Sequence, residues 1–388
     1  MTYEKQVWDG GKFATSGTAA NRMSQQGGQY ESAVPPKIAD LHPRPGHDAE
    51  ELARDAEAEL QSFDSDHGEK MRAFAPILLR SEAAASSQIE RLTASARQIF
   101  TAELGGANKR NAHEIVSNTR SMERAIALSD DISDVTIREM HHVLMKGEPH
   151  HTPGRYRDQP VWIGKNSSSP IGATYVAPDH KIVPELIHDL VLFSRRYDIS
   201  SLLLTAVAHA QFETIHPFSD GNGRTGRALA QSMLRHRRLT RNVAVPVSAG
   251  LLADVDAYYQ ALMDYRSGDI TPIVEIFALA ALRAVPNGRQ LLTEIEAIGE
   301  KWHGSIKPRA RSAKLRLLNY ALYRPVFTAE MAAKEVGVNP TNVYRDLRSF
   351  QEEGYLHVMK EYRGPTIWRQ PEVLEAIDAF AARVGRRI

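Results

Sequence analysis

The chain has 388 residues, of which 42% are apolar and 24% are charged, and it contains no cysteine. This composition is typical of a globular protein with two or three domains, and it excludes disulfides, thiolate metal sites and cysteine nucleophiles. No apolar run approaches the roughly 18 residues of a membrane-spanning helix. The first residues, MTYEKQVWDGGK, lack the apolar core of a signal peptide. We therefore expect a cytoplasmic protein with no membrane partner.

The formal net charge is only +1, but the charges are unevenly distributed along the chain. Residues 301–388 hold 16 Lys and Arg against 9 Asp and Glu, whereas the remaining residues hold 32 against 38. A basic C-terminal segment in a nearly neutral chain favours an anionic partner for that segment. A solvated basic surface is the alternative interpretation.

Residues 1–45 are rich in Gly, Ser, Gln, Ala and Pro, which predicts an extended N-terminal arm, with Gly10 to Tyr30 as an arm or loop. From residue 46 to 285, apolar residues recur every three or four positions, and this spacing predicts helices. Asp134 is the expected N-cap of one of them. The predicted helical segments are Ala49–Ser62, Met71–Glu103, Ala112–Leu128, Val135–Leu144, Val183–Tyr197, Leu202–Thr214, Thr225–Arg237 and Asp254–Arg266.

One interruption breaks the helical pattern between Pro153 and Pro178. Two short β-type runs, Pro160–Ile163 and Ala173–Val176, lie on either side of a KNSSSP turn, which predicts a β-hairpin. A long connecting loop is the alternative, although a segment of this length in a compact domain is more often functional than idle. Further along, Pro286-Asn287-Gly288 indicates a domain boundary.

The densest cluster of chemically useful residues is HPFSDGNGRTGR, from His216 to Arg227. Gly221 and Gly223 leave backbone N–H groups accessible at the start of a helix, where successive N–H groups form an anion site. Arg224 and Arg227 lie three positions apart on one face of that helix. Two guanidinium groups beside a nest of N–H groups suit a polyphosphate.

Two further residues complete a site for nucleotidyl or phosphoryl transfer. Asp220 is the one carboxylate in the loop, and it is the expected ligand of the Mg²⁺ that accompanies a polyphosphate. His216 has an unperturbed pKa near neutrality, so it can accept a proton from a nucleophile as general base. Each residue alone has a structural explanation, but all of these features within one short segment favour a functional site.

The same residues match the Fic signature HPFx(D/E)GNGRxxR at every fixed position, and the resemblance extends from about residue 35 to 380. It implies a mainly α fold, with a helical Fic core and a β-hairpin flap at 160–176 that pairs with a target segment. The implied reaction transfers AMP from Mg-ATP to a Ser, Thr or Tyr hydroxyl of a protein, self-modification included, and releases diphosphate. The implied nucleotide contacts are Gly221, Asn222, Gly223, Arg224, Thr225, Gly226 and Arg227.

Two other segments resemble regions of the same family. The sequence AYYQAL, which begins at Ala257, resembles the adenine-pocket helix and implies that Tyr259 lies beside the base, although Arg266 stands where some relatives have Asn. The sequence SSQIER, from Ser86 to Arg91, resembles the inhibitory motif (S/T)xxxE(G/N). This resemblance implies that Glu90 restrains the enzyme by pairing with Arg227, while Arg91 replaces the usual Gly or Asn.

The C-terminal segment, Ala313 to Trp368, predicts two helices, a tight turn, a third helix and two short strands, which resembles a winged helix-turn-helix. Gly337 would end the second helix, and Asn339 and Pro340 would be the N-cap and first residue of the third. The wing strands would be Tyr355–Lys360 and Pro365–Trp368, around Arg363-Gly364. The third helix would expose Thr341, Asn342, Arg345 and Arg348.

The basic excess favours DNA as the partner of residues 300–388, and protein docking or a homodimer is the alternative. We expect an extended N-terminal arm at 1–45, a helical region with the inhibitory helix at 46–112, the Fic catalytic core at 113–285, and a linker helix with the winged helix-turn-helix at 286–388.

Three competing functions stay open. The enzyme could transfer another group, such as UMP, GMP or a phosphocholine. The chain could be a DNA-binding regulator whose Fic core only senses nucleotide, but a sensor does not need the base His216. A zinc hydrolase could use His209, Glu213 and His216, but the spacing is HxxxExxH and differs from the HExxH of such enzymes.

Overall fold

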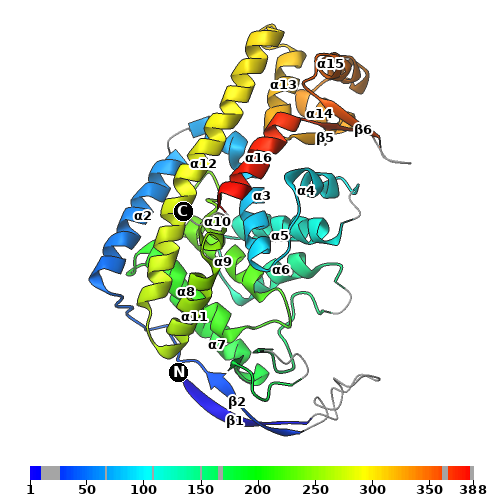
Figure 1. Ribbon diagram of the computed structural model, residues 1–388. Coiled ribbons are helices and arrows are strands. Elements are labelled where there is room, and N and C mark those ends of the chain that lie inside the picture. Colours follow the sequence, from blue (N-terminus) through cyan, green and yellow to red (C-terminus); the bar gives the residue numbers. More distant parts are fainter. Residues whose placement is uncertain are drawn as a thin grey trace. The chain divides into compact units, whose positions relative to one another are not determined.

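The computed structural model of the chain describes residues 1–9, 27–65, 68–106, 109–148, 151–164, 169–360 and 366–384 (Figure 1). Within these ranges the fold is mainly helical with small antiparallel sheets, which confirms the predicted fold class. No helix in the described part of the chain is long and apolar enough to cross a membrane.

Contacts between residues group the chain into two compact units. The first comprises Met1–Asp55, Ser121–Arg238 and Asp256–Ala278, and the second comprises Ala56–Arg120, Leu239–Val255 and Leu279–Ile388. Each unit therefore gathers segments that are far apart in the sequence. The boundaries between the four segments expected from the sequence stay predictions.

The first unit begins with a two-stranded ribbon that the sequence analysis did not predict. Strand β1 (Thr2–Trp8) pairs antiparallel with β2 (Gly28–Val34), so that Thr2 lies opposite Val34 and Trp8 lies opposite Gly28. Most β1 side chains are exposed, so the strand lacks the alternation of apolar and polar residues that marks a half-buried strand. The arm or loop predicted between the strands falls largely on residues 10–26, outside the described residues.

The core of the first unit is built around helix α8 (Ser201–Ile215), which is buried along almost its whole length. Helix α9 (Asn222–His236) packs closely against α8. At Gly226 a Cβ atom would approach Phe212 Cδ1 to 2.9 Å and the Glu213 carboxylate to 2.7 Å. Other helical elements of this unit include α6 (Asp134–Met145), the short 3₁₀ helix η2 (His180–Ile182), α7 (Val183–Ser194) and α11 (Val255–Ser267).

The start of α6 corrects one prediction. The N-cap is Ser133 rather than Asp134, because the Ser133 side chain accepts from the backbone N–H of Thr136 and the Thr136 hydroxyl accepts from the backbone N–H of Ser133. Asp134 lies one position inside the helix. Its carboxylate accepts a hydrogen bond from Tyr156 at 2.5 Å and faces Arg138 at 3.4 Å.

The predicted β-hairpin is confirmed by strands β3 (Trp162–Ile163) and β4 (Tyr175–Val176), which pair antiparallel. Both β4 side chains are buried, whereas Ile163 is exposed. The flap is therefore anchored in the core through its second strand. Residues 165–168 of the predicted turn lie outside the described residues.

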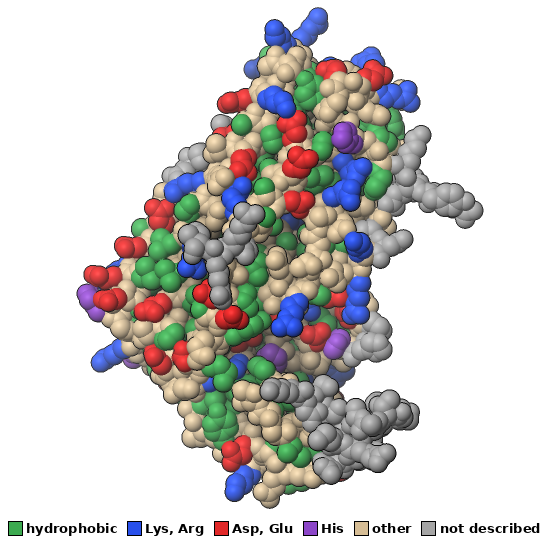
Figure 2. Space-filling model, viewed as in Figure 1, with side chains coloured by type: hydrophobic (Ala, Val, Ile, Leu, Met, Phe, Trp, Pro, Cys, Tyr) green, Lys and Arg blue, Asp and Glu red, His purple; other side chains and the backbone are tan. Residues whose placement is uncertain are grey.

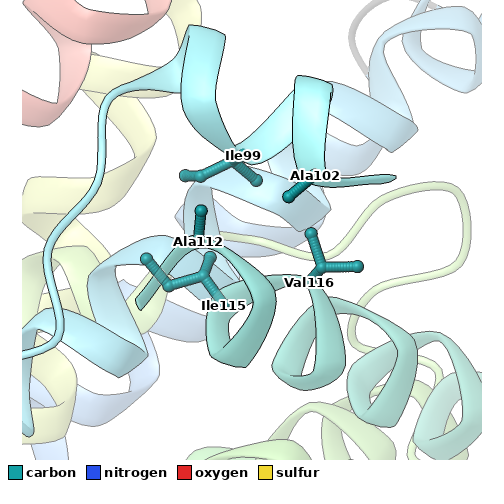
Figure 3. Close-up of a cluster of buried hydrophobic side chains, with 5 residues drawn as sticks. All are labelled: Ile99, Ala102, Ala112, Ile115 and Val116. Atoms are coloured by element: carbon teal, nitrogen blue, oxygen red, sulfur yellow. The ribbon is translucent and has the colours of Figure 1, made fainter. Parts of the chain in front are cut away.

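In the second unit, the helix predicted from Met71 to Glu103 is two helices, α3 (Gly68–Ile89) and α4 (Ala96–Glu103). Arg91 adopts a left-handed conformation with φ of 63°, which interrupts the helix. Ser95 then caps α4 through a capping box with Gln98. Figure 3 shows α4 packing on α5 (Arg110–Ala127) through a buried cluster of Ile99, Ala102, Ala112, Ile115 and Val116.

Helix α12 (Thr271–Ile306) continues through Pro286-Asn287-Gly288, so these residues do not interrupt the secondary structure. A proline removes one helical hydrogen bond, but buried residues on both sides of it, such as Val285 and Leu291, keep the helix packed. Gly288 lies against Phe63 of α2 (His47–Ser65), where a Cβ atom would be only 2.9 Å from the Phe63 ring. In Figure 2, acidic side chains gather over the exposed face of α2.

The C-terminal segment has the predicted order of helices and strands, with one strand added before the second helix. Gly337 has a φ of 69° after α14, and Asn339 and Pro340 begin α15 as expected. The Arg363-Gly364 turn lies outside the described residues, and β5, β7 and β6 form one sheet in that order. The elements are α13 (Ala313–Tyr323), β5 (Val326–Thr328), α14 (Ala329–Val336), α15 (Pro340–Glu352), β6 (His357–Lys360), β7 (Thr366–Arg369) and α16 (Pro371–Val384), while the short α10 (Val247–Leu252) packs on α3.

Candidate active site

The turn that carries His216 has a left-handed backbone. Helix α8 ends at Ile215, and His216 follows with φ of 50° and ψ of 62°. Its backbone N–H donates to Phe212 O at 2.9 Å, so the last helical turn is closed while the chain changes direction. A left-handed residue with a Cβ atom carries local strain, which persists only where the surroundings impose it.

The imidazole of His216 is half-buried, and its Nδ1 lies 3.4 Å from the carbonyl oxygen of Glu213. A carbonyl oxygen only accepts hydrogen bonds, so this contact favours the proton on Nδ1. The lone pair is then on Nε2. This is the protonation state that a general base needs, and the helix that precedes the motif selects it.

A buried arginine outside the motif holds the His216 turn. The Arg157 side chain donates from Nε to His216 O at 2.9 Å, and its backbone N–H donates to Pro217 O at 3.0 Å. The same guanidinium donates to Pro178 O at 2.6 Å, on the far side of the flap. Burial lowers the pKa of Arg157 to about 10, so the group is still charged at neutral pH.

The rest of the loop between α8 and α9 is closed by reciprocal hydrogen bonds between Phe218 and Asn222. Phe218 N–H donates to Asn222 Oδ1 at 2.9 Å, and Asn222 Nδ2 donates to Phe218 O at 2.8 Å. Asn222 is thus fully engaged in shaping the loop. Gly221 caps α9 with φ of 72°, a conformation that favours glycine. Helix α9 begins three residues earlier than the sequence pattern indicated, and its N-terminal N–H groups lie directly after this turn.

The carboxylate of Asp220 lies at the surface of this loop, half-exposed. Its Oδ1 accepts from Gly221 N–H at 2.6 Å, while Oδ2 lies 3.5 Å from His151 Nε2 and 3.9 Å from Arg224. A hard, accessible carboxylate oxygen beside helix N–H groups fits Mg²⁺ with water and phosphate oxygens as its other ligands. Asp220 is the residue that would hold this ion.

His141 on α6 packs against the loop between α8 and α9. Its ring stacks on Phe218 with centroids 3.7 Å apart and an angle of 5° between the planes. Its Nε2 lies 3.1 Å from the backbone oxygen of Asp220, and its Nδ1 accepts from Gly154 N–H at 2.9 Å. Burial lowers the pKa of His141 to about 4, so the ring is neutral at physiological pH.

The two motif arginines extend from the first turns of α9 and are both buried, with Arg224 6% and Arg227 2% exposed. Thr225 is fully buried, and Gly226 faces α8, so the close packing of the two helices accounts for its small size. Because Thr225 and Gly226 are taken up by packing, the accessible N–H groups for a phosphate come earlier in the helix.

The predicted adenine-pocket helix is α11, where the two tyrosines of AYYQAL differ sharply. Tyr258 is buried and its hydroxyl lies 2.7 Å from His209 Nε2, whereas Tyr259 is 45% exposed. An exposed ring face is what a stacked base requires. Arg266 is buried at the end of α11, where it donates to Glu213 O at 3.2 Å and lies 3.9 Å above the Tyr175 ring.

The zinc alternative receives no support from the structure. In the described residues, no group of three or more His, Asp or Glu side chains is placed to hold a metal ion. His209 is buried against Tyr258, and burial together with the charge of Arg227 lowers the pKa of His209 to about 3. This histidine is a core residue.

Glu90 belongs to the second unit and is exposed in the turn that follows α3. The residues before it are fixed: Ser87 donates to Ala83 O at 2.8 Å, and Asn118 of α5 donates to Ser87 Oγ at 3.1 Å. Helix α3 ends at Ile89, so Glu90 lies just beyond the helix that contains Ser86. The pairing of Glu90 with Arg227 stays a prediction.

Three residues that hold the motif from outside it were not predicted from the sequence. Arg157 lies in the PGRYR segment before the flap, His141 lies on α6, and Tyr175 of β4 donates to Thr214 O at 2.5 Å. A lone histidine in an amphipathic helix carries no distinguishing pattern. The arginine had a weak signal, because it follows a Pro-Gly turn in a loop that was itself expected to be functional.

The chain is similar to several known proteins. Residues 131–234 match the Fic/DOC family. A protein adenylyltransferase of Caenorhabditis elegans is 30% identical over 149 residues, or 38% of this chain, and the match spans only 27% of that relative. A probable protein adenylyltransferase of Aquifex aeolicus is 27% identical over 302 residues, which is 72% of this chain and 85% of the relative.

A solved Fic family protein from Desulfovibrio desulfuricans has the same fold, with a TM-score of 0.53 at 21% identity, over 84% of this chain and 98% of that one. The helical fold, the β-hairpin and the complete motif are those of a Fic-type domain. The match to the Fic/DOC family is carried by residues 131–234 of the chain.

Proposed function

We propose that this chain is a protein adenylyltransferase, which transfers AMP from Mg-ATP to a Ser, Thr or Tyr hydroxyl of a protein. The observation that carries the proposal is the His216 turn: an imidazole whose Nδ1 faces Glu213 O stands at one end of a loop whose other end carries Asp220 and the start of α9. The relatives named as protein adenylyltransferases support the same reaction.

Each residue of the motif has its own role in the proposed reaction. His216 Nε2 takes the proton of the target hydroxyl as its oxygen attacks the α-phosphorus. The bond from the α-phosphorus to the bridging oxygen breaks, diphosphate leaves, and AMP is joined to the target through a phosphodiester. Arg224, Arg227 and the first N–H groups of α9 hold the phosphates. Asp220 would hold Mg²⁺, and the ion would supply positive charge to offset the negative charge of the phosphate oxygens.

The test is incubation of the purified chain with cell lysate and ATP, GTP, UTP or CTP labelled at the α-phosphate. Labelled protein bands are expected with α-labelled ATP and not with γ-labelled ATP. Removing a general base costs about 10²–10⁴-fold, so His216→Ala is expected to abolish the bands while ATP binding persists. Bands only with another nucleotide would reassign the transferred group, and bands with γ-labelled ATP would contradict the reaction.

We also propose that Glu90 inhibits AMP transfer. In the segment that resembles the inhibitory motif, Ser87 bonds Ala83 O and accepts from Asn118 of α5, which fixes the last helical turn before Glu90. We propose that the Glu90 carboxylate takes up an arginine of the nucleotide site and so keeps ATP from reacting. This inhibition also bears on self-modification, which we expect to rise when the carboxylate is removed.

A second candidate function concerns residues 300–388. Thr341, Asn342, Arg345 and Arg348 are all exposed on α15, as the sequence pattern predicted. In Figure 2, Lys and Arg side chains gather around the end of α12, where this segment begins. We propose that the basic surface formed by α15 and the end of α12 contacts duplex DNA. The homodimer and the cytoplasmic location stay predictions.

Binding of a labelled duplex to the full chain at several salt concentrations tests the DNA proposal. The logarithm of the binding constant is expected to fall by about 0.9 per phosphate contact for each tenfold rise in salt. Replacing both Arg345 and Arg348 by Ala is expected to lower the slope. No salt-dependent binding at low ionic strength would favour a protein as the partner.

A further inference from the structure

His141 lies outside the motif, but its ring face stacks on Phe218 and its Nε2 lies 3.1 Å from the backbone oxygen of Asp220. We propose that His141 is a positioning residue: it fixes the peptide plane that follows Asp220 and thereby sets the orientation of the Asp220 carboxylate. The proposal rests on the proposed function, because it concerns how this carboxylate meets a metal-bound nucleotide.

The two ring nitrogens of His141 have different and fixed roles. Gly154 N–H donates to Nδ1 at 2.9 Å, so Nδ1 carries a lone pair. In the neutral ring the proton is then on Nε2, which donates to the backbone oxygen of Asp220 at 3.1 Å. The ring is 1% exposed and stacks on Phe218, so it has no room to turn. The hydrogen bond to Asp220 O therefore comes from a rigid donor.

The carbonyl of Asp220 and the N–H of Gly221 belong to the same peptide plane. His141 holds the oxygen side of this plane, while the N–H side donates to Asp220 Oδ1 at 2.6 Å. A rotation of the plane would move both ends together. Loss of the His141 bond therefore lets the Gly221 N–H move, and this N–H holds Oδ1 of Asp220. The other carboxylate oxygen, Oδ2, then changes direction as well.

Helix α6 also limits where the loop can lie. A Cβ atom on Gly221 would come within 3.0 Å of Met145 Sδ and 3.1 Å of Leu144, so the loop rests directly on the helix that carries His141. Arg138 of the same helix donates to Gly154 O at 2.9 Å. Helix α6 and the turn at Gly154 thus hold this part of the loop in place. His141 is bonded to both the turn and the motif.

The alternative is that His141 only fills the core. His141→Phe separates the two roles, because it keeps an aromatic ring against Phe218 and removes both hydrogen bonds. Removing a group that orients a metal ligand typically lowers metal affinity about 10–100-fold. In wild type, Mg²⁺ is expected to raise the affinity for ATP, and in this variant we expect that increase to be about 10–100-fold smaller. The affinity for ATP without Mg²⁺ and the melting temperature are expected to change little.

Calorimetric titration of ATP with and without Mg²⁺ measures both quantities in wild type, in His141→Phe and in His142→Phe. His142 is the exposed neighbour on α6, and its variant is expected to match wild type. His141→Met removes the same two bonds with a more adaptable side chain, so it continues the test if the phenylalanine variant does not fold. His141→Gln, which retains a donor, is expected to recover part of the Mg²⁺ effect.

A folded His141 variant in which Mg²⁺ strengthens ATP binding as much as in wild type would overturn the positioning role and leave the proposed function standing. A wild-type chain that binds ATP in a Mg²⁺-dependent way, with the expected loss in His141→Phe, would support the positioning role even if no AMP transfer is found. The two proposals can therefore fail separately.

Discussion

The guanidinium group of Arg157 donates to the backbone carbonyl of His216, with 2.9 Å between Nε and the oxygen. The base of the proposed reaction is therefore held through its main chain by a residue 59 positions away. The same side chain also bonds Pro178 O at the end of the flap segment. One buried cation thus ties the segment that would hold the target to the turn that would activate it.

We expect Arg157→Lys to lower the initial rate of protein labelling about 100-fold with ATP affinity almost unchanged. A lysine ammonium cannot bond several carbonyls in the planar fan of a guanidinium, and a displacement of about 1 Å at a reacting group costs roughly that factor. Arg155→Lys, two residues earlier and exposed, is the control. Equal labelling rates in the two variants would show that the His216 turn does not depend on Arg157.

Removal of the Asp220 charge is expected to abolish the effect of Mg²⁺. Asp220→Asn retains the shape of the side chain and can still accept from Gly221 N–H, but it lacks the charge that a hard cation prefers. ATP titrations should then give the same affinity with and without Mg²⁺, and labelling should be lost. The control is Ser219→Ala, at the variable position of the motif. A persistent Mg²⁺ effect in Asp220→Asn would place the ion elsewhere.

The N-terminal ribbon is expected to support the flap. Trp8 at the end of β1 contacts Trp162 of β3 edge to face, with centroids 5.7 Å apart. Such a pair contributes about 0.5–1.5 kcal/mol beyond its buried area. Trp8→Ala should therefore raise the KM for a protein target several-fold without changing ATP affinity. Val7→Ala, at a position 76% exposed, is the control. An unchanged KM for the target would mean that the flap is ordered without the ribbon.

His209 is expected to make the free energy of unfolding depend on pH. Burial, followed by the Arg227 charge, lowers its pKa from 6.5 to about 3. Above pH 6.5 the ring is neutral in both states, and its full contribution to stability is present. Between the two pKa values only the unfolded state binds the proton, so stability falls as the pH falls, by up to about 1.36 kcal/mol per unit.

Urea denaturation at pH 7 and pH 5 tests this expectation. The stability advantage of wild type over His209→Gln should shrink by about 2 kcal/mol at the lower pH, because glutamine does not titrate. Groups that are shared by both proteins cancel in this difference. A difference that is independent of pH would mean that the folded protein binds a proton at His209 as readily as the unfolded chain does.

The sequence was most informative where local chemistry decides structure. Gly337, Asn339 and Pro340 each have a conformational preference that needs no tertiary contact, and all three lie where they were expected. The motif from His216 to Arg227 was recognisable for a similar reason, because its glycines, arginines and histidine are close together in the chain.

The sequence was least informative where tertiary contacts override local preference. Pro286 lies inside a helix because buried residues on both sides keep α12 packed. The β1–β2 ribbon forms by pairing between strands whose own patterns are weak. Arg157 and His141 act on the motif through its backbone, and no spacing in the sequence records a contact between residues 59 or 79 positions apart.

The last prediction concerns Glu90, which is exposed directly after α3 and is followed by Arg91 in a left-handed conformation. The helix turn before it is fixed by the bonds of Ser87 to Ala83 O and of Asn118 to Ser87. A carboxylate on a rigid support can hold a guanidinium in a bidentate pair without losing much conformational entropy. If it holds an arginine of the nucleotide site, ATP can still bind but is badly aligned for attack.

Glu90→Gly is therefore expected to raise the initial rates of target labelling and self-labelling tenfold or more at matched ATP, and each tenfold step corresponds to about 1.36 kcal/mol in activation free energy. Glu90→Asp should release the restraint in part, because its side chain is one methylene shorter. Arg91→Gly is the matched neighbour variant, and it tests whether Arg91 competes for the carboxylate: stronger inhibition in that variant would indicate that it does. Equal or slower labelling by Glu90→Gly, with its helix content intact by circular dichroism, would rule out autoinhibition by this residue.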